Sequence, residues 1–320
     1  MPPVAAALPA AIFGWYASSA MSGVTSKQIL GEYPHAFILS ACQFTIAFGC
    51  HAWYTTLLHP TSVFQRQENP RAHTLLVLSA LAYSIGVCSF NAGFWAMHVS
   101  INETLRALEP LVSVVLASTC LRDPQLSRLR LLALVPIVTG VYLSAISNGA
   151  FSIVGMIITM VANIAFPLRA ALVKRLQPFM SLHVMFYSTL YYAMLLQWLL
   201  AGLWSIFGSQ PASSRSITSA NFKELVFALV NGAFFYLYHW CSFVVLSSTD
   251  MVSHAVWNAL RRVTTILFSV WYFGLALHRM NALGMVVACT GALVYAKTLR
   301  WERQTSQLLG SLLKETHQIV

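Results

Sequence analysis

Long apolar runs separated by short polar gaps set the pattern of this chain. Each run is about the length that an α-helix needs to cross the hydrocarbon core of a bilayer, which is about 20 residues. Helix-breaking residues and polar gaps divide the sequence into about ten such runs. The expected spans are 6–29, 36–58, 74–97, 100–119, 131–146, 151–172, 182–207, 225–246, 252–275 and 282–295, with a polar tail after the last one.

Composition supports a membrane protein. Hydrophobic residues make up 58% of the chain and charged residues only 9%, whereas soluble domains have about 25% charged residues. The net charge of +10 suggests nucleic acid as one partner. However, the basic residues lie in the gaps between apolar runs, as in membrane proteins, and form no continuous basic face. We therefore expect an all-α integral membrane protein that faces lipid and does not bind nucleic acid.

The two halves of the chain show weak internal sequence similarity. With five helices in each half, the second copy enters the membrane from the opposite side, which makes an inverted repeat. The repeats would be residues 1–150 and 151–320, the second ending in the polar tail, and chance similarity between apolar halves is the competing explanation. The similar positions are the Leu-Arg pairs at 105–106 and 260–261, the Thr-Gly pairs at 139–140 and 290–291, and the helix-closing lysines Lys27 and Lys174.

Three arginines lie too far from the ends of their predicted spans to reach the interface easily: Arg106 in the fourth span, and Arg261 and Arg262 in the ninth. An arginine at the centre of a membrane helix costs about 2.5–3.5 kcal/mol on insertion scales, so it is retained only with compensation. One compensation is a dianionic ligand in a water-filled cavity. The planar guanidinium fork suits phosphate because it donates two parallel hydrogen bonds.

The alternative for these arginines is an internal salt bridge. Glu103 and Glu109 are within reach of Arg106 by sequence, and Asp250 is the acid nearest to the 261–262 pair. Successive residues of a helix point about 100° apart, so one arginine of that pair can face a ligand while the other is paired.

Four further polar residues are weaker candidates. Tyr238 lies mid-span, and a buried tyrosine hydroxyl needs a partner, either a ligand phosphate or a packed neighbour. Lys27 and Lys174 lie near predicted helix ends, where interfacial anchoring is the expected role. Arg169, five residues before Lys174, is placed to reach a cavity.

Enzyme and metal motifs are absent from the sequence. It contains no Gly-rich phosphate loop, no H-E-x-x-H helix and no G-x-S-x-G elbow. The six cysteines are scattered singly in apolar segments, which supports neither a zinc site nor a disulfide framework. We predict no enzyme activity, no cofactor and no metal.

Four segments carry a resemblance to a known family. The chain resembles the plastidic phosphate translocators of the drug/metabolite transporter superfamily, which exchange triose phosphate, phosphoenolpyruvate or hexose phosphate for phosphate. The likeness extends over essentially the whole chain, and the first two segments are the most specific. The segments are ETLRALEPLVSVVLAS, HAVWNALRRVTTILFSV, ANIAFPLRAALVKRL and SKQILGEYPHAF.

The resemblance implies a phosphate site. In this family a lysine of the fourth helix and a Lys-Arg pair of the ninth grip the phosphate, and a tyrosine of the eighth helix assists. Those positions fall on Arg106, Arg261, Arg262 and Tyr238. Two of the family's lysines are therefore arginine here, which keeps the charge but changes the hydrogen-bond geometry.

The residues that would line the organic part of the substrate depart from the family. Val87 and Phe90 stand where plastid members have a histidine and a Ser/Thr, whereas Asn91 is kept. Glu103 replaces the histidine that precedes the fourth-helix lysine, and His254 opens the ninth-helix motif. These differences bear on which metabolite is carried.

The function that the resemblance implies is antiport of a phosphorylated small metabolite (triose phosphate, phosphoglycerate, phosphoenolpyruvate or a sugar phosphate) against inorganic phosphate by alternating access, in the plastid envelope. One alternative is a nucleotide-sugar transporter of the Golgi or endoplasmic reticulum, from the same superfamily. Another is a membrane enzyme acting on lipid phosphates, which would need an acidic metal-binding cluster that the sequence lacks.

Overall fold

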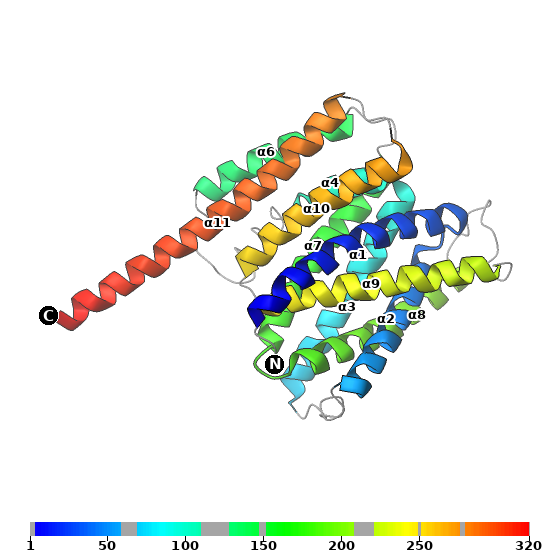
Figure 1. Ribbon diagram of the computed structural model, residues 1–320, viewed down its shortest axis with the longest axis horizontal. Coiled ribbons are helices and arrows are strands. Elements are labelled where there is room, and N and C mark those ends of the chain that lie inside the picture. Colours follow the sequence, from blue (N-terminus) through cyan, green and yellow to red (C-terminus); the bar gives the residue numbers. More distant parts are fainter. Residues whose placement is uncertain are drawn as a thin grey trace.

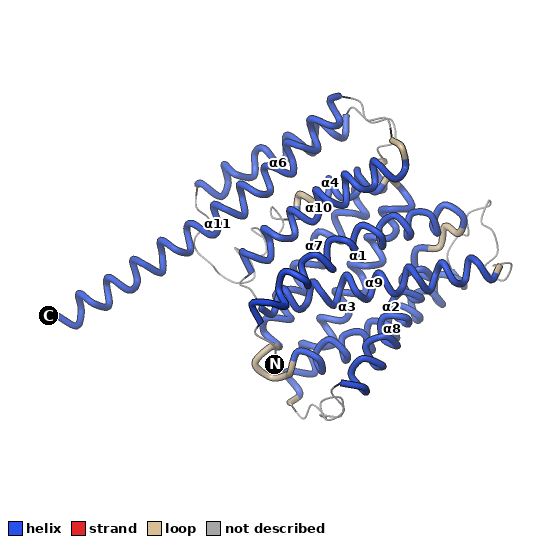
Figure 2. The backbone as a smooth tube through the Cα atoms, in the orientation of Figure 1, coloured by secondary structure: helices blue, strands red, loops and turns tan. Residues whose placement is uncertain are grey.

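The computed structural model describes residues 4–58, 69–109, 128–146, 152–207, 221–248, 251–275 and 279–319. All the regular structure in these ranges is helical, and the helices pack into one bundle (Figures 1 and 2). The helices are α1 (Val4–Glu32), α2 (Ala36–Leu58), α3 (Pro70–Ala96), α4 (Val99–Arg106), α6 (Arg128–Ile146), α7 (Ile153–Leu176), α8 (Leu182–Phe207), α9 (Phe222–Ser248), α10 (Met251–Phe273) and α11 (Arg279–Ile319).

Six of these helices are long and apolar enough to cross a bilayer: α2, α3, α7, α8, α9 and the 282–302 part of α11. Large apolar side chains point outward from them, among them Trp53 and Leu199. Such a surface suits lipid, and helices satisfy their own backbone hydrogen bonds there. The predicted class, an all-α integral membrane protein, is confirmed, and the count of ten spans stays a prediction.

The ends of several helices agree with the hydropathy pattern. The bounds of α2 and α8 coincide with the expected spans 36–58 and 182–207. The fourth span was expected at 100–119, but α4 ends at Arg106 in a turn, and residues 110–127 lie outside the described part of the chain.

The expected polar tail is helical. Helix α11 continues from the predicted tenth span to Ile319 and extends beyond the bundle (Figure 1). This stretch contains no proline after residue 295 and is rich in Glu, Gln, Leu and Lys, which have high helix propensity. Local propensity therefore carries the helix past the apolar run on which the prediction was based.

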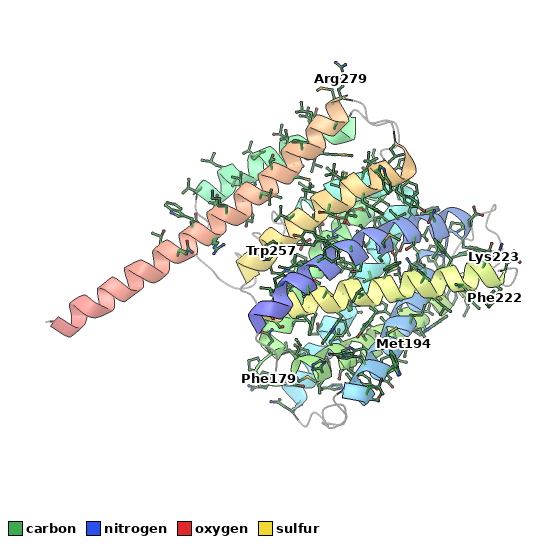
Figure 3. The ribbon with its side chains drawn as sticks, viewed as in Figure 1. Phe179, Met194, Phe222, Lys223, Trp257 and Arg279 are labelled. Carbon is green, nitrogen blue, oxygen red and sulfur yellow. The ribbon has the colours of Figure 1, made fainter. Side chains whose placement is uncertain are left out.

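Helices from the two halves of the chain pack against each other. α1 lies on α9, α3 on α7, α2 on α8, and α6 on α11, and α10 contacts α1, α4 and α11. The largest apolar cluster lies between α2, α3, α8 and α9 and includes Phe44, Tyr83, Phe186 and Phe235. Figure 3 shows that side chains fill the space between these helices.

A buried polar network joins α1, α2, α3 and α9. The Asn91 amide donates to Gln43 Oε1 at 2.7 Å, and Gln43 donates to Asn231 Oδ1 at 2.9 Å. Asn231 in turn donates to Thr25 Oγ1 at 2.7 Å. Hydrogen bonds between helices hold a bundle together in lipid, where apolar contact alone gives little preference for protein over lipid.

Two glycines let α6 and α11 approach closely. A Cβ on Gly140 would lie 2.2 Å from the backbone nitrogen of Ala288, and one on Gly291 would lie 2.8 Å from the backbone nitrogen of Ile137. Small residues at such crossings allow backbones to touch, as in other membrane helix pairs.

We expect Gly140→Ala to destabilise the protein by about 1–3 kcal/mol, because the added methyl group meets backbone atoms that cannot rotate away. Gly202→Ala is the matched control, since nothing lies within 4 Å of a Cβ at Gly202 on α8. Thermal unfolding of the purified protein in detergent measures both. Equal unfolding midpoints for the two variants would contradict the close contact.

Candidate functional site

The three arginines predicted inside membrane helices are buried close together. Arg106, Arg261 and Arg262 are 3%, 1% and 4% exposed. The carboxylate of Glu109 accepts from Arg106 Nη2 at 2.8 Å and, through the same Oε2 atom, from Arg262 Nη2. Glu109 therefore joins the end of α4 to the middle of α10.

Arg261 is held by three different helices. Its Nη1 donates to Ser19 Oγ on α1 at 2.5 Å and lies 3.5 Å from Glu103 Oε1 on α4. Its Nε donates to Asn258 Oδ1 at 3.0 Å, one turn earlier on α10. The guanidinium is thus fixed in orientation before any ligand binds.

Side chains of α7 position the end of α4. The Asn163 amide donates to the Leu105 carbonyl at 3.0 Å, and the Thr159 hydroxyl donates to Asn102 Oδ1 at 2.7 Å. The Leu105 carbonyl also accepts from the backbone N–H of Leu108 at 3.1 Å, in the turn that ends α4. Arg106, the last residue of α4, is therefore placed by a helix end that α7 stabilises.

Helix α10, which carries Arg261 and Arg262, is positioned by α1 in a similar way. The Tyr16 hydroxyl donates to the carbonyl of Trp257, one turn before Arg261, at 2.7 Å. The side chain of Trp257 is labelled on α10 in Figure 3. Together with the bond from Arg261 to Ser19, this contact fixes the rotation of α10 against α1.

Aromatic rings flank the cations. The Cζ atom of Arg106 lies 5.0 Å from the ring centre of Phe90 and 4.4 Å from that of Phe166. The Cζ atom of Arg261 lies 5.3 Å from the ring centre of Tyr238. Ring faces attract cations most strongly where water is excluded, so these contacts lower the cost of burying the guanidinium groups.

A fourth arginine lies nearby on α7. The Cζ atom of Arg169 is 3.7 Å from the ring centre of Tyr83 and 5.8 Å from that of Phe243. Its Nε and Nη2 atoms are buried without a hydrogen-bond partner among the described residues. The sequence had marked Arg169 as placed to reach a cavity.

Three other polar atoms at the site also lack a hydrogen-bond partner within the ranges that the structure describes. They are Arg106 Nε, Arg262 Nη1 and Glu103 Oε2. A buried donor without an acceptor costs about 1–3 kcal/mol, and more when it belongs to a charged group. An anion with several oxygens would supply acceptors for these guanidinium donors.

The charges of the site do not cancel. Around this centre the described residues place four guanidinium groups (Arg106, Arg169, Arg261 and Arg262) against two carboxylates (Glu103 and Glu109). The excess is two positive charges in a region of low dielectric. A dianion such as hydrogen phosphate would neutralise that excess.

The ion-pair alternative and the ligand-binding prediction are therefore compatible. Arg106 pairs with Glu109, as one alternative expected, but Glu103 pairs with Arg261 instead. Asp250, the acid expected near the 261–262 pair, lies outside the described residues. Each pairing leaves guanidinium charge or donors to spare.

The remaining predicted residues lie in different surroundings. Val87 belongs to the apolar core and Asn91 to the polar network of α1, α2, α3 and α9, so neither has a described contact with the arginines. His254 stacks on Trp15 with ring centres 4.9 Å apart, and its Nε2 lies 3.4 Å from Ser242 Oγ.

The two helix-closing lysines bind helix ends. Lys27 Nζ on α1 donates to the carbonyls of Phe94 and Met97, at the end of α3, at 2.6 and 2.9 Å. Lys174 Nζ on α7 donates to the carbonyl of Leu246, at the end of α9, at 2.9 Å. Cations suit helix C-termini because the helix dipole is negative there.

Two neighbours of the arginines were not singled out from the sequence: Ser19 and Phe166. Ser19 lies in a run of small and hydroxyl residues on α1, which reads as packing until α10 is placed beside it. Phe166 is part of a segment that resembles the family, yet its position against Arg106 depends on how α7 meets α4. No group of three or more metal-ligating residues occurs in the described ranges.

A bundle of apolar helices around buried guanidinium groups fits one class of protein, the helical membrane transporters. The chain matches the model of the Triose-phosphate Transporter family over residues 6–296, and it belongs to that family. The resemblance found in the sequence is thereby confirmed.

Three relatives illustrate the similarity. Phosphoenolpyruvate/phosphate translocator 1, chloroplastic, of Oryza sativa subsp. japonica is 27% identical, covering 91% of this chain and 71% of the relative. Phosphoenolpyruvate/phosphate translocator 2, chloroplastic, of Arabidopsis thaliana is 27% identical, covering 90% and 76%. Triose phosphate/phosphate translocator, chloroplastic, of Zea mays is 28% identical, covering 89% and 69%.

The fold also has a match among solved structures. A crystal structure superposes with a TM-score of 0.60 over 92% of this chain and 96% of that chain, at 15% sequence identity. At this identity the match concerns the fold alone.

We expect Glu109→Gln to destabilise the protein by about 3–5 kcal/mol, because it removes the charge that two buried arginines share. Glu32→Gln is the control, since Glu32 is exposed at the end of α1. Thermal unfolding in phosphate-free detergent solution measures both variants. A Glu109→Gln midpoint equal to that of the control would show that the carboxylate does not compensate Arg106 and Arg262.

Proposed function

We propose that this protein is an antiporter that exchanges a phosphorylated small metabolite for inorganic phosphate by alternating access. The observation that carries the proposal is the convergence of Arg106, Arg261 and Arg262 from α4 and α10, with guanidinium donors left unpaired. Membership of the family and the names of the relatives support phosphate and phosphorylated metabolites as the two cargoes. The chloroplast location of those relatives supports the plastid envelope.

The phosphate is proposed to bind between α4 and α10. Arg106 Nε and Arg262 Nη1 are buried and have no hydrogen-bond partner in the described part of the chain. Arg261 is oriented by Ser19 and Asn258, and Tyr238 flanks it. Planar forks hold a phosphate in a defined orientation, whereas lysine acts as a point charge.

The organic part of the substrate is proposed to extend toward α3 and α7. Phe90 and Phe166 border Arg106 on that side and present apolar surface. Beyond them lies Arg169, with two unpaired donors that suit a second anionic group on the substrate. Among the positions expected to line the pocket, Phe90 and Glu103 lie nearest to the arginines; Val87, Asn91 and His254 are more distant candidates.

The bundle is proposed to consist of two inverted repeats, residues 1–150 and 151–320, with ten membrane spans. In this division the equivalent helices of the two repeats are α1 and α7, α2 and α8, α3 and α9, α4 and α10, and α6 and α11, and the contacts between helices support it. If each helix is replaced by its equivalent in the other half, the contact between α1 and α9 becomes a contact between α7 and α3, and that between α2 and α9 becomes one between α8 and α3. All four of these contacts occur in the structure.

Contacts of individual residues in one half also have equivalents in the other half. Gly140 meets the backbone of Ala288, and Gly291 meets that of Ile137, with equal offsets of 151 residues between the equivalent positions. Lys27 of α1 binds the end of α3, and Lys174 of α7 binds the end of α9. These paired contacts favour an inverted repeat over chance similarity between apolar halves.

The charge excess provides a mechanism for exchange. An empty site would bring the arginines together in low dielectric, where their repulsion opposes closure. A bound dianion neutralises the excess and allows one repeat to rock against the other around the site. The carrier would then reorient mainly when it is loaded.

We expect liposomes containing the protein and preloaded with phosphate to take up labelled phosphate much faster than liposomes without internal phosphate, because closure needs a bound anion. Filtration assays of uptake measure the difference. Equal rates in the two preparations would rule out the exchange mechanism.

Two arginine variants test the location of the site in the same assay. Arg261→Ala should abolish exchange, whereas Arg175→Ala, which removes an exposed charge at the end of α7, should retain it. Exchange that survives in Arg261→Ala would place the phosphate site elsewhere.

We expect phosphate and phosphorylated C3 acids or sugars to raise the thermal unfolding midpoint, because a ligand that binds only the folded state stabilises it in proportion to occupancy. A panel of phosphate, phosphoglycerate, phosphoenolpyruvate, triose phosphate, hexose phosphates and nucleotide sugars, measured at equal concentration, ranks the cargo. Stabilisation by UDP- or GDP-sugars alone would favour the nucleotide-sugar alternative.

A further inference from the structure

Glu103 differs from the other buried acid of the site in how firmly it is held. The Glu103 side chain is 1% exposed, and its Oε1 lies 3.5 Å from Arg261 Nη1, at the outer limit of a hydrogen bond. Its Oε2 has no hydrogen-bond partner in the part of the chain that the structure describes. Glu109, in contrast, binds Arg106 and Arg262 together through short contacts.

A carboxylate in this place competes with phosphate for the same donor. Nη1 of Arg261 already donates to Ser19, so an arriving phosphate oxygen and Glu103 Oε1 approach one guanidinium edge. The two anions also repel each other where little water screens them. A phosphate that binds this edge of Arg261 competes with Glu103 for the guanidinium, and the single long contact of Glu103 makes it the acid that is displaced most readily.

When the site is empty, the Glu103 carboxylate compensates Arg261 instead of competing with phosphate. It then supplies Arg261 with a negative charge, which lowers the repulsion among the arginines that opposes closure of the unloaded carrier. The family motif that α4 resembles has a histidine at this position, so a fixed negative charge here is a feature of this chain.

We propose that Glu103 is a tethered counter-anion that replaces phosphate on Arg261 in the empty site and lets the unloaded carrier reorient slowly. The protein then carries out net, uncoupled transport of phosphate beside its exchange. This inference rests on the proposed function, because it presupposes that Arg261 binds the transported anion.

The test compares wild type with Glu103→Gln, which keeps the shape of the side chain and removes its charge. Labelled phosphate uptake is measured into liposomes with and without internal phosphate, and the ratio of the two rates is the readout. In wild type, uptake into unloaded liposomes should be well above that of protein-free liposomes. In Glu103→Gln the ratio of unloaded to preloaded uptake should fall severalfold.

Binding gives a second readout that a purely structural role would not produce. Glu103→Gln should bind phosphate severalfold more tightly than wild type in calorimetry, because Arg261 no longer has an internal competitor. A residue needed only for packing would weaken binding when altered.

Two further variants complete the design. Glu32→Gln, which alters an exposed carboxylate at the end of α1, should match wild type in both readouts. Glu103→Asp, whose shorter side chain draws the charge away from Arg261, should give an intermediate ratio. If Glu103→Gln shows no exchange even in liposomes preloaded with phosphate, the uptake ratio of Glu103→Asp alone tests the role of Glu103.

The outcomes separate the two proposals. Background uptake by wild type into unloaded liposomes, or an uptake ratio that does not fall when Glu103 is altered, overturns the role of Glu103 and leaves exchange intact. Absence of phosphate exchange by wild type in preloaded liposomes, or equal uptake with and without internal phosphate, refutes the proposed antiport itself.

Discussion

The cost of placing guanidinium groups inside an apolar helix bundle governs the arrangement of this protein. Each of Arg106, Arg261 and Arg262 is almost fully buried, and no single partner compensates any of them completely. Carboxylates, a serine hydroxyl, an asparagine amide and aromatic faces share the task, and they come from six different helices. The bundle has to bring these helices together before the charges are tolerable, so the site and the fold depend on the same contacts.

The sequence was most informative where physics allows few solutions. Apolar runs of helix length gave the bounds of α2 and α8, because lipid leaves a spanning segment little choice but a helix. Arginines inside such runs were recognisable for the same reason, since their cost marks them against the apolar background. The helical form of the polar tail at the end of α11 was not predicted, because this helix follows from residue propensity, which hydropathy does not measure.

Partner choice among the buried charges was beyond the reach of sequence spacing. Glu103 is three residues from Arg106 and seemed a natural partner, yet it contacts Arg261 on another helix. Ser19 gave no signal, because a serine on a helix rich in small residues usually serves close packing. Both depend on the rotation of α10 against α1 and α4, which long-range contacts such as that from Tyr16 to Trp257 decide. The roles of the arginines in binding remain proposals, whereas their proximity is a feature of the structure.

The spacing of the charge pairs has a consequence for biosynthesis. Arg106 and Glu109 are three residues apart, so they can enter the membrane already paired as the nascent chain is inserted. Glu103 and Arg261 are separated by 158 residues, and most of the second half must be synthesised before they meet. Until α10 has been synthesised, Glu103 lacks the arginine that it contacts in the folded bundle. This link between the two halves of the chain therefore forms late in the assembly of the protein.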